Sequence, residues 1–330
     1  MSNLESAPAE LTCGSTAAAA EAPERGLVLE AREVPLGGPR AMTVRRTLPQ
    51  RARSLIGAWC FADHYGPDDV SVSGGMRVPG HPHTGLQTVS WLFRGEVEHR
   101  DTLGTHAYVR PGELNLMTAG AGIAHSEYST PATSVLHGVQ LWVALPERHR
   151  FAAPWFEHYA PPVLDRDGAR ILVFLGTLAG HSAPVRTYSP LVGAEITLPA
   201  GQPLRLGVDP ADEHGVLVDT GRVVVGGVPA GPGRLVYLPV GADELALRAG
   251  DEGEARVLLL GGRPLGERIV MWWNFIGRDH DEIAAYREQW TRERAGVTYA
   301  EPARFGTFPP QWRDTLPAPV LPTARLRPRG

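Results

Sequence analysis

Two short pairs of residues are the ones best suited to chemistry. His81 and His83 lie in the run GMRVPGHPH, and His125 and Glu127 lie in AGIAHSE. Side chains two positions apart on a β-strand project to the same face. If the two segments are antiparallel neighbours, three imidazole nitrogens and one carboxylate meet at one point. We therefore predict that these four residues form a single metal site.

This donor set leaves the identity of the metal open. Three imidazoles and one carboxylate suit Zn, Fe, Ni, Co or Cu, and intrinsic affinity favours Cu. Four ligands leave zinc tetrahedral and closed, whereas an iron that prefers six ligands keeps two cis positions free.

The rest of the chain predicts β-strands to position these pairs. The 330 residues include 38 Gly and 30 Pro, which suits many short strands joined by tight turns. Apolar or alternating runs recur from about residue 27, with a break at residues 145–162. The two halves share an echo, in which Gly112 precedes Thr118-Ala-Gly and Gly233 precedes Pro239-Val-Gly. We predict an all-β fold with a duplicated β domain.

Only one helix is expected, over residues 279–295. Asp279 can cap it, and Glu282 completes a capping-box pattern. Arg292 and Arg294 complement the helix dipole before Gly296 ends the helix. The Pro-rich tail that follows cannot lie inside a sheet, so it is either extended along the surface or disordered. Residues 1–28 have the composition of a disordered extension.

Charge and composition exclude several classes of protein. A net charge of −4 gives no footprint for direct nucleic-acid binding. No run is long and apolar enough for a membrane span, and the first residues do not form a secretory signal. Cys13 and Cys60 make no disulfide framework, which favours a reducing compartment. We expect a cytoplasmic protein, and a monomer.

The first pair resembles the first motif of the cupin superfamily. In that motif a glycine, five residues and HxH are followed by a glutamate and a further glycine. Gly75, His81 and His83 match in register, and Gly95 can be the closing glycine. Gln87 departs from the pattern, because it stands where the usual glutamate ligand would be. Glu127 supplies the carboxylate from the second motif instead.

That relocation is similar to the pirin family of bicupins. The stretch HPHTGLQTVSWLFRGEVEHRDTLG, followed by PGELNLMTAGAGIAHSE, resembles the pirin signature, and MWWNFIGRDHDEI is typical of bacterial pirin-like proteins. The resemblance spans about residues 29–300. It implies two tandem cupin (double-stranded β-helix, jelly-roll) barrels, with Fe(II) in the N-terminal one only. Zn, Ni, Co, Cu or Mn remain the alternatives.

These inferences divide the chain into four parts. Residues 1–28 are the extension, 29–146 the metal-binding cupin domain, 147–277 a cupin domain without metal, and 278–330 the helix and tail. In the second domain Glu244 falls where a ligand histidine would be, and no HxH occurs between Ile171 and Gly262. His214 is isolated, and we expect it in an exposed turn. This domain would serve as a structural wall or an interaction surface.

Several polar residues are candidates to orient the ligands. Gln87, Glu98, Asp101 and Gln140 are possible partners of the imidazoles. His99 and His106 can line the mouth of the pocket. His64 and His137 are expected in packing or loops, although alternation allows His137 to face the cavity. Most of the nearby apolar residues should be core, but one or two can form a wall for an aromatic substrate: Trp91, Phe93, Leu116, Met117 and Ile123.

Two functions are compatible with one ligand set. In the first, the chain is a quercetin 2,3-dioxygenase-like enzyme, as the resemblance implies for some pirin-like proteins. Its partners would be O₂ and a small aromatic or enol substrate, and Glu127 would be catalytic by accepting the substrate's hydroxyl proton. In the second, it is a non-catalytic, redox-responsive iron protein that regulates a transcription or metabolic protein partner. Other cupin chemistry on a different metal, such as isomerisation, is a third alternative.

Overall fold

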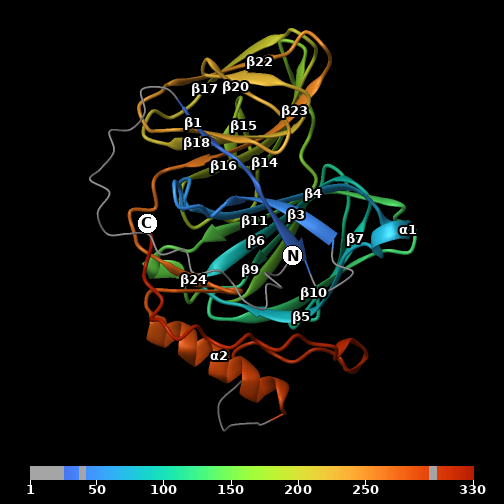
Figure 1. Cartoon of the computed structure of the whole chain (residues 1–330), viewed down its shortest axis with the longest axis vertical. Coiled ribbons are helices and arrows are strands. Elements are labelled where there is room, and N and C mark those ends of the chain that lie inside the picture. The colour runs from blue at the N-terminus through green and yellow to red at the C-terminus, as the bar shows by residue number, and fades with distance from the viewer. Residues whose placement is uncertain (1–25, 37–41, 297–302) are drawn as a thin grey trace.

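The computed structural model describes residues 26–36, 42–296 and 303–330. Four antiparallel sheets stack as two barrels, and a C-terminal helix lies against the far side of the first barrel (Figure 1). The predicted all-β fold with two tandem β-barrels and one C-terminal helix is therefore confirmed. Among the described residues, neither α-helix combines the length with the apolar character that a membrane span requires.

The first barrel has a seven-stranded and a four-stranded sheet. In spatial order the larger sheet contains β12 (Trp155–Tyr159), β9 (Leu114–Thr118), β6 (Leu86–Arg94), β11 (Val135–Ala144), β4 (Trp59–Asp69), β3 (Met42–Leu48) and β2 (Arg32–Leu36). The smaller sheet contains β5 (Arg77–His83), β10 (Ile123–Ser129), β7 (Val97–Asp101) and β8 (His106–Val109). A short helix, α1 (Val70–Ser73), follows β4.

The second barrel repeats this plan with an eight-stranded and a four-stranded sheet. The larger sheet contains β1 (Leu27–Leu29), β21 (Leu235–Leu238), β18 (Glu213–Thr220), β23 (Ala255–Gly262), β16 (Leu191–Leu198), β14 (Ala169–Leu178) and β13 (Leu164–Arg166), and β15 (His181–Ser182) pairs with β14. The smaller contains β17 (Pro203–Gly207), β22 (Glu244–Ala249), β19 (Val223–Val225) and β20 (Val228–Ala230).

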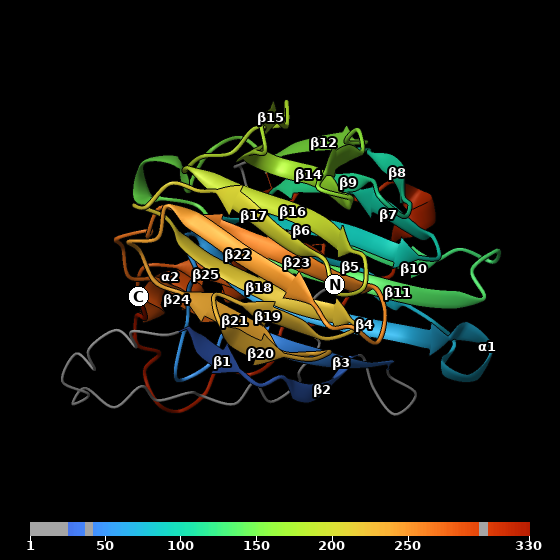
Figure 2. The same cartoon turned by 90° about the horizontal axis from the view of Figure 1, so that it is seen from above.

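The two larger sheets pack face to face through one buried apolar cluster, and in the view from above the strands of the second barrel lie over those of the first (Figure 2). Alternation along β11 decides which side chains serve this interface, because successive residues point to opposite faces. Val139, Leu141 and Val143 pack against Leu217 and residues of β23 in one buried apolar cluster. Trp142 points the other way, into the first barrel, where it belongs to a different cluster. Strand β11 is thus buried on both faces.

The chain after β23 returns to the first barrel. A hairpin of β24 (Val270–Trp272) and β25 (Phe275–Gly277) leads into α2 (His280–Arg294), and η2 (Pro310–Trp312) lies in the tail. Asp279 caps α2 by accepting from the Glu282 N–H, as predicted. Ile283, Tyr286 and Trp290 bury one face of α2 against the hairpin and the tail. We call residues 263–296 and 303–330 the C-terminal arm.

Several segments cross the boundaries drawn from the sequence. β1, which begins inside the predicted extension, pairs with β21 of the second barrel. β12 lies in the predicted break at residues 145–162, yet it pairs with β9 of the first barrel. The hairpin before residue 277 also packs on the first barrel. Residues 1–25, where most of the predicted extension falls, lie outside the described part, and so does Cys13.

Candidate metal centre

The register of two strands brings the predicted ligand pairs together. β10 pairs antiparallel with β5, so that His125 lies opposite His81 and Ile123 lies opposite His83. A shift in register follows, after which Glu127 lies opposite Val78. This irregularity falls at Pro79 and Gly80, immediately before the first ligand. All four predicted side chains are buried in the first barrel, with exposures of 0–1%.

Hydrogen bonds fix which nitrogen of each imidazole faces the centre. Nδ1 of His81 lies 2.9 Å from the Pro79 carbonyl oxygen, and Nδ1 of His83 lies 3.0 Å from the Asn274 carbonyl oxygen. A carbonyl only accepts, so both Nδ1 atoms must carry the hydrogen. The Nε2 atoms therefore keep their lone pairs, and Nε2 of His83 lies 3.1 Å from Nε2 of His125. Nε2 of His81 is buried and has no hydrogen-bond partner in the described residues.

Burial keeps these imidazoles neutral. Desolvation lowers the pKa of His83 to about 3. It also holds the pKa of His81 and of His125 well below the usual range, and repulsion between the neighbouring imidazoles adds to the effect. Because neutral imidazole is the metal-binding form, these groups need release no proton before they bind an ion. Buried lone pairs that face one another have no better partner than a cation.

The donor set fits a transition metal. His81, His83 and His125 offer ligand atoms within 4.8 Å of one another, and Glu127 forms a second such group with His125 and His99. Ser90 Oγ donates to Glu127 Oε1 at 3.1 Å and also lies 3.0 Å from Oε1 of Gln140. The two groups share His125, and the Glu127 carboxylate also interacts electrostatically with His81, so it lies near the imidazoles. Nitrogen donors with one carboxylate suit iron, zinc, nickel, cobalt or copper.

The outer edge of the ligand strand is covered by the C-terminal arm. Gly80 N–H donates to the Asp314 carbonyl at 2.8 Å, and Leu316 N–H donates to the Gly80 carbonyl at 2.8 Å. A Cβ at Gly80 would come within 2.5 Å of the Phe308 ring, so only glycine allows the arm this close. On the other side of the ligands, Ile276 N–H donates to the Thr84 carbonyl at 3.0 Å. The arm thus brackets the HxH motif.

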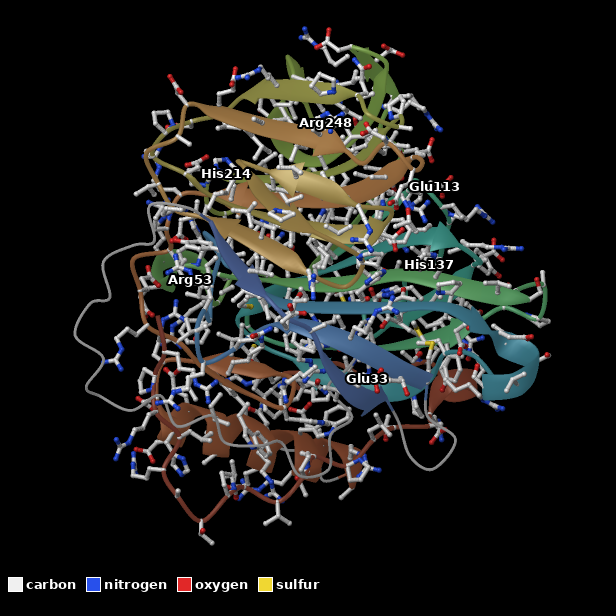
Figure 3. All side chains as sticks on the ribbon, turned by 45° about the horizontal axis from the view of Figure 1, so that its top comes forward. Glu33, Arg53, Glu113, His137, His214 and Arg248 are labelled. Carbon is white, nitrogen blue, oxygen red and sulfur yellow. The ribbon has the colours of Figure 1, made fainter. Side chains whose placement is uncertain are left out.

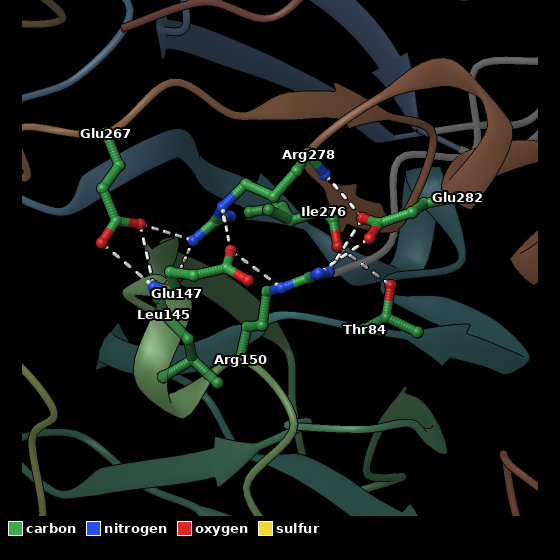
Figure 4. Close-up of polar contacts among 8 residues, drawn as sticks. All are labelled: Thr84, Leu145, Glu147, Arg150, Glu267, Ile276, Arg278 and Glu282. Carbon is green, nitrogen blue, oxygen red and sulfur yellow. Dashed lines mark hydrogen bonds and ion pairs between the residues drawn. The ribbon is translucent and has the colours of Figure 1, made fainter.

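A network of ion pairs holds the arm in place (Figure 4). Arg278 pairs with Glu267 at 2.7 Å and with Glu147 at 3.0 Å. Arg150 pairs with Glu147 at 3.0 Å and with Glu282 at 2.8 Å. The network joins α2 and the hairpin to η1 (Glu147–His149), the turn after β11. It therefore anchors the segment whose Asn274 carbonyl orients His83.

Some predicted partners of the ligands lie elsewhere. Gln87 donates to Thr118 and to the Arg186 carbonyl, on the side that faces the second barrel, so it is not near the ligands. Glu98 pairs with Arg100 and His106 on the outer face of β7. Gln140 and Asp101 do lie behind the site, through Ser90 and His99 respectively. His99 is 2% exposed, so it belongs to the buried site and not to its mouth.

The predicted aromatic wall is also placed differently. Trp91, Phe93 and Leu116 pack toward the second barrel, whereas Met117 and Ile123 line the first barrel near the ligands. The aromatic residue beside the site is Trp142, whose ring lies edge-on to His83 with a centroid separation of 5.1 Å. Phe61 stacks on it at 4.1 Å. Alternation along β11 and β4 gives two faces for each strand but does not say which of them is inside the first barrel, so it could not identify either residue.

The second barrel has an aliphatic interior in place of ligands. Its buried cluster consists of Ala, Val, Leu and Ile side chains from both of its sheets. Glu244 is exposed and pairs with Arg205 at the surface. His214 corrects our expectation of a solvent-exposed turn, since it is 1% exposed on β18. Among the described residues, no group of three potential ligands lies within this barrel alone.

Another polar cluster lies between the barrels (Figure 3 labels His137 there). Nε2 of His64 and Nε2 of His137 lie 2.7 and 2.6 Å from Oδ1 of Asp219, which belongs to the second barrel. Arg256 pairs with Oδ2 of the same carboxylate, and Arg45 lies 3.2 Å from Nδ1 of His64. Two adjacent guanidinium groups oppose a dication, and the Asp219 carboxylate already has His64, His137 and Arg256 as partners. We interpret this cluster as an interdomain contact.

Fold and site together define a class, the two-barrel cupins, here with a candidate metal centre in the described part of the first barrel. Family models place the chain within it: residues 41–143 match the Pirin model, and residues 193–296 match the Pirin C-terminal cupin domain. The chain belongs to the pirin family. The resemblance noted from the sequence is thus confirmed.

Similar proteins agree with this assignment. A Pseudomonas aeruginosa protein, named as a candidate quercetin 2,3-dioxygenase, is 44% identical over 88% of this chain and 89% of its own. A pirin-like protein of Caulobacter vibrioides is 32% identical over 86% of this chain and 99% of its own. The crystal structure of a quercetin 2,3-dioxygenase from Acinetobacter baumannii matches with a TM-score of 0.84 and 36% identity, covering 93% of this chain and 99% of that one.

Proposed function

We propose that this chain is an iron-dependent dioxygenase of the quercetin 2,3-dioxygenase type, acting on a flavonol or another enol. One observation carries the proposal: three imidazoles whose Nε2 lone pairs are turned toward one another lie beside a buried carboxylate. The names of the Pseudomonas and Acinetobacter relatives support the reaction class.

Each group in the site has a definite task under this proposal. His81, His83, His125 and Glu127 would hold Fe(II), which when bound supplies open positions for O₂ and an enolate oxygen and exchanges electrons with both. The Glu127 carboxylate accepts the hydroxyl proton of the substrate, and Ser90 holds that carboxylate in place. Trp142 and Phe61 form a dry wall behind His83. An apolar wall lowers the local dielectric and so strengthens the electrostatic interactions in the site.

Oxygen uptake tests this proposal. The Fe(II)-loaded chain should consume O₂ when a flavonol is added, and the metal-stripped chain and His125→Ala should not. His106→Gln is a suitable control, because His106 lies on the outer face of the same sheet. Turnover by the metal-stripped chain would overturn the proposal. An iron-loaded chain that consumes no O₂ with any flavonol or enol would instead favour the redox-responsive regulator.

A further inference from the structure

His99 and Asp101 on β7 lie directly behind the ligand His125. β10 is the strand between β5 and β7, so each ligand on β10 has a neighbour on each side. In the pairing of β10 with β7, His125 lies opposite Asp101 and Glu127 lies opposite His99. His99 and Asp101 are 2% and 0% exposed. Burying a carboxylate and an imidazole costs free energy, so we ask what these two groups do for the candidate ligand beside them.

The contacts form one chain of hydrogen bonds with a single consistent direction. Nε2 of His125 faces His83, so its Nδ1 is on the opposite side of the ring, 3.4 Å from Nδ1 of His99. If Nε2 of His125 holds the ion, Nδ1 carries the hydrogen and donates it to His99. His99 then carries its own hydrogen on Nε2, which lies 3.2 Å from Oδ2 of Asp101.

The far end of this chain is fixed by backbone. Oδ1 of Asp101 accepts from the N–H groups of Leu103 and Thr105 at 2.9 and 3.0 Å. The Phe156 ring packs on His99, with centroids 4.8 Å apart. Neither imidazole can turn without breaking these contacts. The carboxylate is therefore a rigid anchor, and His99 transmits its position to His125.

We propose that His99 and Asp101 are positioning residues for the metal, acting through His125. This inference rests on the metal-binding role proposed above for His125. A carboxylate that accepts through His99 keeps His125 in the Nδ1–H tautomer, holds its ring plane and makes its Nε2 a stronger donor. His81 and His83 each donate directly to a backbone carbonyl oxygen. His125 instead donates to a second imidazole, His99, which in turn donates to the Asp101 carboxylate.

Cobalt(II) binding by the full chain tests the proposal without reference to catalysis. Affinity and the visible Co(II) spectrum are measured for the parent chain, His99→Phe, His99→Gln, Asp101→Asn and the outward-facing control His106→Gln. His99→Phe keeps the ring's bulk but cannot accept or donate, so binding should weaken about 10- to 100-fold. His99→Gln can both accept from His125 and donate to Asp101, so it should restore most of the affinity. Asp101→Asn should fall between these two.

The outcomes separate this inference from the proposed function. Parent-like affinity and spectrum in both His99→Phe and Asp101→Asn would overturn it. Equal losses in His99→Phe and His99→Gln, with a spectrum of changed coordination number, would also overturn it, because His99 would then be a ligand. If His125→Ala binds Co(II) as the parent does, the proposed site itself fails. Unfolding temperatures of the metal-free variants identify any variant that is misfolded. The Co(II) affinities of the correctly folded variants then decide whether His99 and Asp101 position the metal.

Discussion

His83 Nδ1 donates to the carbonyl oxygen of Asn274 across 3.0 Å, although 191 positions separate the two residues in the chain. The partner that sets the tautomer of a candidate ligand on β5 therefore comes from the C-terminal arm. The same arm makes backbone hydrogen bonds to Gly80 and Thr84, on either side of the HxH motif. The candidate metal site of the first barrel therefore needs the C-terminal arm, which follows the second barrel in the sequence.

Loosening the arm should weaken metal binding from a distance. Arg278→Ala removes the ion pairs to Glu267 and Glu147 and the hydrogen bond to the Leu145 carbonyl. Breaking such a partly buried network should cost about 1–3 kcal/mol of unfolding free energy. It should also weaken Co(II) binding, because the Asn274 carbonyl is less firmly held. Denaturant unfolding and Co(II) titration measure the two effects.

Arg205→Ala is the matched control for Arg278→Ala. Arg205 also pairs with a glutamate, Glu244, but on the exposed surface of the second barrel. Exposed ion pairs contribute little, so both measurements should stay near the parent values. Equal Co(II) affinity in Arg278→Ala and the parent would contradict the link between the arm and the site.

Loss of the Glu127 charge should impair the site more than loss of the Ser90 hydroxyl that donates to it. Glu127→Gln keeps the shape but removes the negative charge, so it should abolish flavonol-dependent O₂ uptake and weaken metal binding. Ser90→Ala removes the hydroxyl that donates to Oε1 of Glu127 and also contacts Gln140, and a hydrogen bond to a charged acceptor is worth about 1.5–3 kcal/mol. Its loss should reduce metal affinity about tenfold or more. Parent-like O₂ uptake in Glu127→Gln would show that the carboxylate is not needed.

The contact between the barrels should depend on Asp219. Its carboxylate accepts from His64 and His137 and pairs with Arg256, so Asp219→Ala leaves a buried cluster without its anion. Removing one partner of a buried pair typically costs about 3–5 kcal/mol. Asp209→Ala, in an exposed pair with Arg263, should cost far less. Similar unfolding free energies for the two variants would contradict the assigned role of the cluster.

The sequence predicts which side chains share a face in the two candidate ligand pairs, because strand geometry is local. A period of two places His81 with His83 and His125 with Glu127 whatever the rest of the fold does. The turns at Gly112 and Gly233 could also be predicted from the sequence. Both glycines have positive φ, at 74° and 80°, and each lies in the turn before a strand, β9 or β21. Such positions follow from backbone sterics and need no knowledge of tertiary contacts.

Contacts between distant segments could not be predicted in this way. Asn274 acts through its backbone carbonyl, for which the residue type carries no signal. Gln87 and Trp91 lie on the face of β6 that meets the second barrel, and alternation gives two faces without saying which is inside. The expectation for His214 is wrong for a related reason: an isolated polar residue is typical of an exposed turn, but β18 buries this one.

Acid should weaken the interface between the barrels. Burial and the adjacent Arg45 lower the pKa of His64 below its usual 6.5, although Asp219 opposes the shift. The unfolded chain therefore takes up this proton first as the pH falls, so the stabilisation is complete above about 6.5 and declines below it. Unfolding temperatures at pH 7.5 and 5.5 should differ more for the parent than for His64→Gln. His149→Gln, a half-buried histidine in η1, should keep the parent's difference.

One ion per chain should stabilise the fold measurably. The imidazoles of the first barrel bind best when the barrel is folded, whereas the second barrel offers an aliphatic interior. An ion at about 100 times its dissociation constant should add about 2.7 kcal/mol to the unfolding free energy. Chelation should therefore lower the unfolding temperature of the parent but not of His83→Ala, because that variant lacks a ligand. Metal analysis should give one equivalent for the parent, and two equivalents would contradict the assignment of a single site.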